Sequence, residues 1–313
     1  MRAAIINSFG GPEVFEISEV PMPTLKDDQV LVKAYASSVN PIDWKQRKGN
    51  HKFIMGSNFP ITLGYDTAGV VEQVGSKVKS FTVGDEVCGV LNNKYGGAYA
   101  EFVVGKEDCF ALLPKSIDFY QGAVIPMVGL TVLQAFRKIG LNNKSHIIIN
   151  GAAGGVGHVA VQLAKLNGAK VTAITSAAHA EMVKEFNPDK IVDYKTIDIL
   201  ASGMKCDIFF DVVGVYSYPE TRHLLNNKGI YYTTLPRPKL LKHKLKALFS
   251  KGHKVKTSLM KHNAVDLIEV VKLVEDGKLK IHIDKSFKLE EVSEAQAYMQ
   301  QGHTEGKISL RIR

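Results

Sequence analysis

The chain of 313 residues contains few cysteines and no long apolar run. Its three cysteines, Cys88, Cys109 and Cys206, are odd in number and widely spaced, which argues against a disulfide framework and against a cysteine metal knuckle. No stretch approaches the roughly 18 apolar residues of a membrane-spanning helix, and the N-terminus lacks the features of a signal peptide. These absences predict a soluble protein of a reducing compartment, the cytoplasm.

One segment lacks acidic residues altogether. The chain has 40 basic and 31 acidic residues, a net charge of +9, but residues 236–256 contain eight basic residues and no acid, so the other 292 residues carry only about +1. The eight are Arg237, Lys239, Lys242, Lys244, Lys246, Lys251, Lys254 and Lys256. Because the basic charge is local, it does not indicate a general nucleic-acid-binding protein.

The same basic segment has an apolar side. Leu241, Leu245, Leu248 and Phe249 recur at helical spacing, and lysines cover the other face. Such a helix can lie on anionic lipid, cover a substrate site or pack on a second subunit. Solvation or packing is the commoner role of a lysine-rich face, so we expect one of these and leave a peripheral membrane contact open.

The length predicts two domains, of which the first is rich in strands. Within residues 1–123, extended stretches such as 29–35, 68–74 and 86–90 are separated by Gly, Pro, Asn and Asp, a pattern typical of a small β-barrel. Residues 280–313 become irregular again and end in a strand-like run, which we expect to rejoin this first domain. The first domain is therefore expected to be discontinuous.

The second domain, residues 124–279, shows a different pattern, in which predicted strands and helices alternate. The apolar strands predicted at 146–150 and 170–175 flank a helix predicted at 155–166. The alternation continues with helices predicted at 178–186 and 264–275. Strand runs without polar alternation, separated by helices, predict an α/β domain with a doubly wound parallel sheet covered on both faces.

A glycine-rich loop joins the first strand and the first helix of that domain. In Asn150-Gly151-Ala152-Ala153-Gly154-Gly155-Val156-Gly157, Gly154 allows the backbone to approach a pyrophosphate and Gly157 allows the helix to pack close to the strand. The helix N-terminus offers unpaired N–H groups to the anion. Ala152 stands where the usual first glycine would be. The context still favours dinucleotide binding over a plain turn, with Ala152, Gly154, Gly155, Val156 and Gly157 as contacts.

The next strand, 170–175, bears on which dinucleotide binds. NAD-binding folds place an acid near its end to hold the ribose 2′-hydroxyl, but no acid occurs here before Glu181. Ser176, His179 and Tyr194 are able to contact a 2′-phosphate instead, although each is equally explicable as an ordinary surface residue. Together they predict NADPH rather than NADH.

These motifs resemble the medium-chain dehydrogenase/reductase superfamily, and within it the zinc-free quinone oxidoreductases. The groups most similar are the chloroplast-envelope quinone oxidoreductase homologues and the alkenal/one oxidoreductases. The resemblance covers nearly the whole chain and is carried by residues 40–45, 63–69, 78–87, 129–131, 151–165 and 302–307. It implies a GroES-like β-barrel catalytic domain, a Rossmann domain, an active site in the cleft between them, and a homodimer.

The resemblance also allows a prediction about metal. Zinc-dependent members hold the catalytic ion with a Cys, a His and a second Cys, and the matching positions here are Asn40, Tyr65 and Met127. An amide, a phenol and a lone thioether do not make a zinc site. The four-cysteine structural lobe of those relatives is also missing. We therefore expect no metal.

Without a Lewis acid, hydride delivery to quinones or α,β-unsaturated carbonyls is the favoured chemistry, because delocalisation places the developing charge on oxygen. Asn40 and Tyr65 are the candidate hydrogen-bond donors to that oxygen, although Asn40 also suits a turn and Tyr65 a buried aromatic position. The resemblance implies that Thr131 contacts the nicotinamide end of the cofactor and that Gly214 lies by its ribose. The alternative is a low-turnover NADPH-binding protein that uses residues 236–256 to bind a partner or a membrane surface.

Overall fold

The computed structural model describes residues 1–235, 239–248 and 250–313, which form two compact units. Unit 1 comprises residues 1–130 and 261–313, and unit 2 comprises residues 131–260. The first unit is therefore discontinuous. Its second segment begins earlier than residue 280, because the helix α9 (Ala264–Glu275) packs on the strand β8 (Phe110–Leu112) of unit 1.

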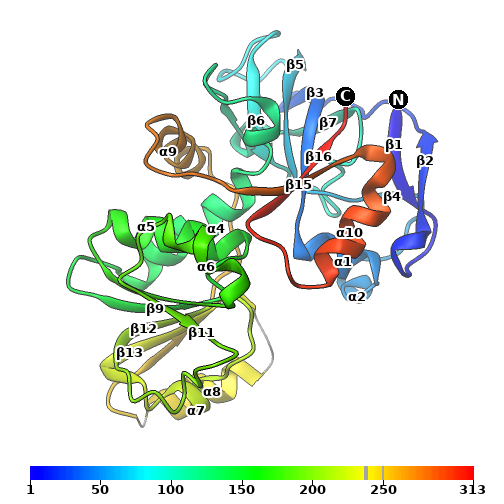
Figure 1. Ribbon diagram of the computed structural model, residues 1–313. Coiled ribbons are helices and arrows are strands. Elements are labelled where there is room, and N and C mark those ends of the chain that lie inside the picture. The colour runs from blue at the N-terminus through cyan, green and yellow to red at the C-terminus, as the bar shows by residue number, and fades with distance from the viewer. Residues whose placement is uncertain (236–238, 249) are drawn as a thin grey trace. The chain divides into compact units, whose positions relative to one another are not determined.

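Unit 1 is built on two sheets (Figure 1). The larger sheet has the order β15-β16-β3-β5-β6-β8, with β7 also paired to β3. Its strands are β3 (Gln29–Val39), β5 (Asp66–Val74), β6 (Glu86–Val90), β7 (Phe102–Lys106), β8, β15 (Ile283–Lys288) and β16 (Lys307–Arg311). A three-stranded sheet joins β1 (Arg2–Ile6), β2 (Phe15–Glu19) and β4 (Ile61–Thr62). These short strands agree with the small β-barrel that the sequence pattern predicts, which the family resemblance implies to be GroES-like.

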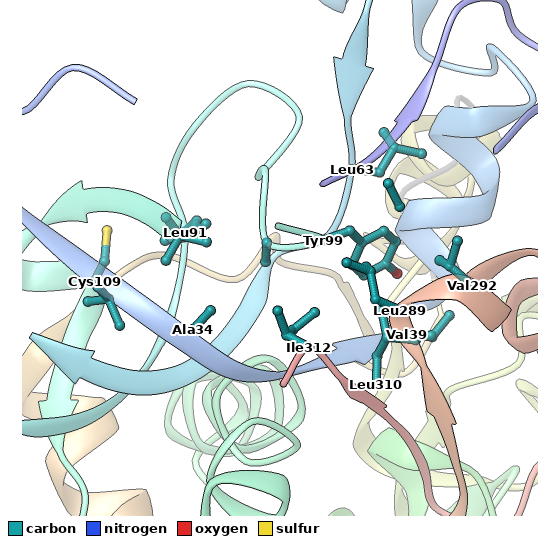
Figure 2. Close-up of a cluster of buried hydrophobic side chains, with 14 of the residues drawn as sticks. Ala34, Val39, Leu63, Leu91, Tyr99, Cys109, Leu289, Val292, Leu310 and Ile312 are labelled. Atoms are coloured by element: carbon teal, nitrogen blue, oxygen red, sulfur yellow. The ribbon is translucent and has the colours of Figure 1, made fainter. Parts of the chain in front are cut away.

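Strand β16 explains why unit 1 needs both ends of the chain. Its residues pair antiparallel with β3, from Ile308 opposite Val39 to Arg311 opposite Ala36. Leu310 and Ile312 then join a core that contains Leu63, Leu91 and the fully buried Tyr99 (Figure 2). Removing these side chains from water favours the joined arrangement, so the C-terminal strand is part of the core of the first unit.

Short helices complete unit 1. They are α1 (Pro41–Arg47), α2 (Lys52–Met55), α3 (Phe119–Gly122), α9 and α10 (Val292–Gln300), with 3₁₀ turns η1 (Pro12–Val14), η2 (Glu107–Cys109) and η4 (Leu289–Glu291). Helix α1 follows β3 directly and begins at Pro41, where a proline loses no intrahelical hydrogen bond. Its polar residues Asp43, Gln46 and Arg47 are buried, which is unusual for so short a helix.

Unit 2 contains one parallel sheet with strand order β11-β10-β9-β12-β13-β14. The strands are β9 (His146–Asn150), β10 (Lys170–Thr175), β11 (Lys190–Asp193), β12 (Cys206–Asp211), β13 (Leu225–Thr233) and β14 (Lys254–Lys256). Helices α5 (Gly155–Leu166) and α6 (Ala180–Lys184) lie on one face, and α7 (Tyr218–Thr221) and α8 (Lys239–Leu248) lie on the other (Figure 1). This Rossmann arrangement confirms the predicted fold class.

The strongest patterns predicted their elements to the residue: β9, α5, β10 and α9 all have the expected bounds. The helix expected at 178–186 is instead the 3₁₀ turn η3 (Ala177–His179) followed by α6. Helix α4 (Pro126–Ile139) begins in unit 1 and continues in unit 2. Short, partly polar segments such as β11 show no clear hydrophobic period, so the sequence pattern does not predict them as strands or helices.

Part of the basic segment also forms the expected helix. In α8, Leu240 and Ala247 are buried, whereas Leu241 and Leu245 are exposed, as are the lysines between them. Residues 236–238 and 249, which include Arg237 and Phe249, lie outside the described residues. Among the helices that the structure describes, none is both long and apolar enough to cross a membrane.

Candidate functional site

The glycine loop lies at the carboxyl ends of the parallel strands of unit 2. Strands β10 and β12 pair with opposite sides of β9, and the chain connects to them in opposite directions across the sheet. Such a switch point leaves a crevice at the carboxyl edge, where dinucleotides bind in sheets of this order. Residues 151–154 follow β9, and α5 begins at Gly155, so the predicted loop lies at this crevice.

Two glycines in this loop have different steric surroundings. A Cβ on Gly157 would lie 1.9 Å from the carbonyl oxygen of Gly151, so only glycine permits this approach of helix and loop. A Cβ on Gly154 would find a single atom within 4 Å, again the Gly151 oxygen, at 3.6 Å. The space beside Gly154 is thus open to a ligand. Helix packing requires Gly157, whereas Gly154 leaves room for a pyrophosphate.

The backbone amides of the loop also fall into two groups: some hold the loop to the sheet, and others begin the helix. The N–H groups of Gly151 and Ala152 donate to the oxygen of Ile174 at 3.2 and 3.0 Å, which attaches the loop to β10. The amide of Ala152 is therefore occupied, and its side chain is fully buried. The first turn of α5, at Gly155, Val156 and Gly157, begins a helix, where amides have no intrahelical acceptor. These amides, with the helix dipole, suit an anion.

Asp211, at the end of β12, fixes the opposite side of the crevice. Its Oδ1 accepts from Asn150 Nδ2 and from the amide of Gly214, both at 2.8 Å, and its Oδ2 accepts from the amide of Tyr216 at 3.2 Å. Burial raises the pKa of Asp211, and these hydrogen bonds oppose the rise. The carboxyl group thus connects the end of β9 to the Gly214 loop, where Gly214 has φ of 75°.

Two of the three residues predicted to contact a 2′-phosphate are neighbours at the ends of β10 and β11. Thr175 pairs with Asp193, and the amide of Tyr194 donates to the oxygen of Thr175 at 3.1 Å. Ser176 is buried rather than superficial, Tyr194 is half exposed, and His179 lies one short turn beyond Ser176. Glu181 is the first acid after β10, and its Oε2 lies 3.8 Å from Nζ of Lys184. Contact of these residues with a cofactor stays a prediction.

A buried polar network in unit 1 surrounds Asp66, the first residue of β5. Ser38 Oγ donates to Asp66 Oδ2 at 2.6 Å, and Asn40 Nδ2 donates to the same oxygen at 2.8 Å. The amide of Met127 donates to Oδ1 at 2.9 Å. Asp66 is 0% exposed, so these donors replace the water that an ionised carboxylate requires.

Lys307 supplies the opposite charge. Its Nζ lies 3.6 Å from Asp66 Oδ2 and donates to Asn40 Oδ1 at 2.6 Å, and the residue is 2% exposed. An ammonium only donates and a carboxylate only accepts, so these two groups fix the orientation of the Asn40 amide between them. Burial lowers the pKa of Lys307, whereas Asp66 opposes that change. A charged pair so enclosed is retained only with well-directed hydrogen bonds.

Asp43 adds a second carboxyl group to this region. Its Oδ2 accepts from the amide of Asn40 at 2.7 Å and from the hydroxyl of Tyr99 at 2.8 Å. Its Oδ1 is buried without a hydrogen-bond partner among the described residues. Burial raises the pKa of Asp43 from 3.8 to about 7, and the nearby Asp66 contributes in the same direction. The region therefore holds one fully compensated carboxylate and one that titrates near neutrality.

Tyr65 precedes Asp66 in the chain and is partly exposed. The hydroxyl accepts from Gln46 Nε2 at 2.6 Å and donates to the carbonyl of Lys94 at 3.1 Å. Burial raises the pKa of Tyr65 to about 12, so the phenol keeps its proton at neutral pH. Asn40, in contrast, is 2% exposed, and both ends of its amide are engaged by Asp66 and Lys307. Its action on a substrate stays a prediction.

The positions matched to zinc ligands therefore converge on a network of protein groups. Asn40 and Met127 contact Asp66, and Tyr65 is its chain neighbour. In the described ranges 1–235, 239–248 and 250–313, no group of three or more His, Cys, Asp or Glu is placed to hold a metal. The three thiols are buried and separate, and burial raises the pKa of each to about 12.

Sequence reasoning did not identify Asp66, Lys307, Asn150 and Asp211 as parts of the two sites. The available signal was a polar residue at the end of an otherwise apolar strand, which is costly unless it has a partner. The partner of each such side chain lies far away in the chain, so a local pattern does not identify it. Thr131 lies in the middle of α4 and is half buried, and its proximity to the nicotinamide stays a prediction.

Two family models match the chain. Residues 26–115 match the alcohol dehydrogenase GroES-like domain, and residues 187–310 match the family described as zinc-binding dehydrogenase.

Individual proteins give a finer comparison. The chain is 36% identical to the chloroplast envelope quinone oxidoreductase homolog of Arabidopsis thaliana, over 98% of this chain and 97% of that protein. It is 32% identical to the NADPH-dependent alkenal/one oxidoreductase of the same plant, over 98% and 78% respectively. The structure matches Escherichia coli quinone oxidoreductase complexed with NADPH, with a TM-score of 0.86, 25% identity and 100% of both chains covered.

The fold, the order of the strands and the relatives therefore agree. The chain is an oxidoreductase of the medium-chain dehydrogenase/reductase superfamily and belongs to its quinone-oxidoreductase-like group.

Proposed function

We propose that this protein transfers hydride from NADPH to quinones or α,β-unsaturated carbonyl compounds without using zinc. The observation that carries the proposal is the buried network of Asp66, Lys307 and Asn40 beside a protonated phenol at Tyr65. The family resemblance matches Asn40 and Tyr65 to positions of zinc ligands. Relatives named as quinone and alkenal/one oxidoreductases support the acceptor class.

The carboxyl edge of unit 2 fits a nicotinamide dinucleotide. The open space at Gly154 and the helix start at Gly155 suit the pyrophosphate, and Gly214 lies across the switch point. Strand β10 has no acid, and none follows it before Glu181. Ser176 after β10 and Tyr194 after β11, where Thr175 pairs with Asp193, therefore favour the 2′-phosphate of NADPH. When bound, this cofactor supplies the hydride. Thr131 and His179 complete the proposed set of contacts.

Tyr65 is the group we propose to act on the acceptor. Its hydroxyl proton now points to the carbonyl of Lys94, at 3.1 Å, and an acceptor oxygen would replace that carbonyl. Gln46 continues to donate to the phenol oxygen, which holds the ring and strengthens its O–H as a donor. Because its pKa is raised to about 12, Tyr65 stabilises charge on oxygen by hydrogen bonding, and water protonates the enolate.

The network beside Tyr65 supports the proposal that the site uses no metal. The Asp66 carboxylate already has the Lys307 ammonium as its counter-charge. An amide, a phenol and a thioether at Asn40, Tyr65 and Met127 offer no thiolate or imidazole to zinc. We propose that Asn40 acts within this network, where its amide connects Lys307 to Asp66. A cytoplasmic homodimer is also part of the proposal, and sedimentation analysis and cell fractionation test it.

The function is tested by following NADPH oxidation at 340 nm against short enones, long alkenals, ortho- and para-quinones and saturated aldehydes. We expect turnover with conjugated acceptors, none with saturated aldehydes, and a higher KM for NADH than for NADPH. Tyr65→Phe should lower kcat/KM about tenfold or more, because one hydrogen bond to the developing oxyanion is lost.

The matched control is Tyr95→Phe, whose hydroxyl donates to the Gly56 carbonyl. It should leave turnover near that of the unmodified protein. Full activity in Tyr65→Phe would remove Tyr65 from the site. Negligible rates with every acceptor, alongside tight NADPH binding, would instead support the low-turnover binding protein.

A further inference from the structure

A second concave site lies at the edge of the unit 2 sheet opposite the glycine loop. It is a cavity of about 420 Å³ at the amino ends of β12, β13 and β14. Its lining residues are Lys205, Arg222, His223, Leu225, Ser250, Lys251 and His253. Three of these seven are lysine or arginine, two are histidine and none is acidic. The cavity lies within the size range of small-molecule pockets.

The cavity is formed by loops that hydrogen bonds hold together. The amide of Lys228 donates to the oxygen of Lys251 at 3.0 Å, which joins the turn in β13 to the loop after α8. Lys205 Nζ donates to the carbonyl of His223 at 2.6 Å. Lys251 has φ of 45° and Gly252 has φ of 74°, a tight turn at the rim. The basic groups therefore converge through the fold.

These positive charges lack compensation. Within the part of the chain that the structure describes, neither Arg222 nor Lys251 forms a side-chain ion pair or hydrogen bond. The two acids nearest in sequence to the pocket have other partners. Asp207 accepts from the amide of His146 and from Asn226 Nδ2, both at 2.8 Å, and Glu220 accepts from the amide and the hydroxyl of Ser217 at 2.7 and 2.5 Å. Like charges that surround a cavity without counter-charge attract an anion.

His253 provides an independent indication. It is 6% exposed, its Nδ1 lies 3.2 Å from the Tyr218 hydroxyl, and its Nε2 is buried without a hydrogen bond of normal geometry among the described residues. Burial lowers the pKa of His253, the backbone of Asn226 opposes this, and Lys251 lowers it further. A bound anion would remove the repulsion from Lys251 and favour the charged ring.

We propose that this cavity binds a phosphate group of a small molecule, a phosphate monoester or a diphosphate. The three permanent charges of Lys205, Arg222 and Lys251 match two or three negative charges, and Arg222 offers the planar donor pair that suits phosphate oxygens. Strand β12 has six residues, so this site is roughly 17 Å from the carboxyl edge at which the cofactor is proposed to bind. The proposal does not depend on the proposed reaction.

Calorimetric titration of inorganic pyrophosphate into the full-length protein saturated with NADPH tests the site, because the cofactor occupies the glycine loop. We expect one equivalent to bind, and the double variant Arg222→Gln/Lys251→Gln to weaken binding at least about tenfold, since two charge-assisted contacts are lost. The matched control is Lys144→Gln/Lys190→Gln, which removes the same charge from exposed lysines of unit 2 outside the cavity. Unfolding curves check that both variants are folded.

Vesicles of phosphatidylcholine containing phosphatidic acid form the second arm. Binding of pyrophosphate that depends on Arg222 and Lys251 identifies a soluble ligand, and such dependence seen only with vesicles identifies a lipid headgroup as the source of the phosphate. The proposal is overturned if neither probe binds saturably, or if the two double variants weaken binding equally.

Discussion

The two units build their sites by different means. In unit 2 the cofactor edge is made mostly from backbone: a loop attached to β10 by Gly151 and Ala152, and a helix start at Gly155. In unit 1 the proposed site rests on a network of side chains from three distant parts of the chain, Asn40, Asp66 and Lys307. A backbone site depends on where side chains are absent, whereas a side-chain network depends on every member being present.

The largest expected effect is that of removing the cation from the unit 1 network. Lys307→Met leaves Asp66 buried without a counter-charge, so the free energy of unfolding should fall by about 3–5 kcal/mol. Denaturant titration measures it. The double variant Asp66→Asn/Lys307→Met leaves no charge unpaired and should recover most of the loss. A loss below about 1 kcal/mol in the single variant would show that the pair is not the support we describe.

A smaller effect on the free energy of unfolding is expected from Asp43, the second carboxyl group of this network. The folded state binds a proton at Asp43 up to about pH 7, whereas the unfolded chain releases it near pH 3.8. The folded protein therefore holds more protons between these values, and the contribution of Asp43 to stability falls as pH rises through that window. Asp43→Asn keeps an oxygen that accepts from the Asn40 amide and Tyr99, and it removes the titration.

The variant should therefore gain stability relative to the unmodified protein, by about 2 kcal/mol or more, as pH is raised from about 4 to about 8. Denaturant titrations across this range provide the measurement. A difference between the two proteins that stays constant with pH would mean that Asp43 titrates normally.

The smallest effect distinguishes the two glycines of the backbone site. Gly154 has φ of −75° and an open side, so Gly154→Ala should fold normally but weaken NADPH binding about tenfold, because the methyl group occupies space proposed for the pyrophosphate. Fluorescence titration with NADPH tests the expected loss of affinity, and a thermal unfolding curve tests whether the variant folds normally.

Gly157→Ala is the paired variant. Its methyl group would lie 1.9 Å from the Gly151 oxygen, so this change should lower stability by about 1–3 kcal/mol as the helix is displaced. Unchanged NADPH affinity in Gly154→Ala would show that the cofactor does not approach this glycine.

The contrast between the local backbone site of unit 2 and the long-range network of unit 1 explains which elements the sequence could predict. Strand β9, helix α5 and strand β10 were predicted to the residue, because a short apolar run, a glycine loop and a 3.6-residue period are all local. The fold class followed from their alternation. Tyr65 and Asn40 were identified as site residues only through the family resemblance.

The features that the sequence could not predict depend on contacts between distant segments. Nothing near Lys307 in the sequence indicates that β16 would pair with β3 and bring its ammonium to Asp66. The start of the second segment of unit 1 was missed for a similar reason, because the packing of α9 on β8 decides it. Buried charges are specified by their partners, and a single sequence does not show these partners.

The protein is proposed to transfer hydride to conjugated acceptors without zinc, with the Tyr65 hydroxyl stabilising the charge that develops on oxygen. The most direct measurement is the rate of NADPH oxidation with a conjugated enone, by protein treated with a chelator and shown by metal analysis to contain well under one equivalent of zinc. The account predicts that the treated protein keeps its full rate and that added zinc does not raise it. A rate lost with the metal and restored by zinc would contradict it.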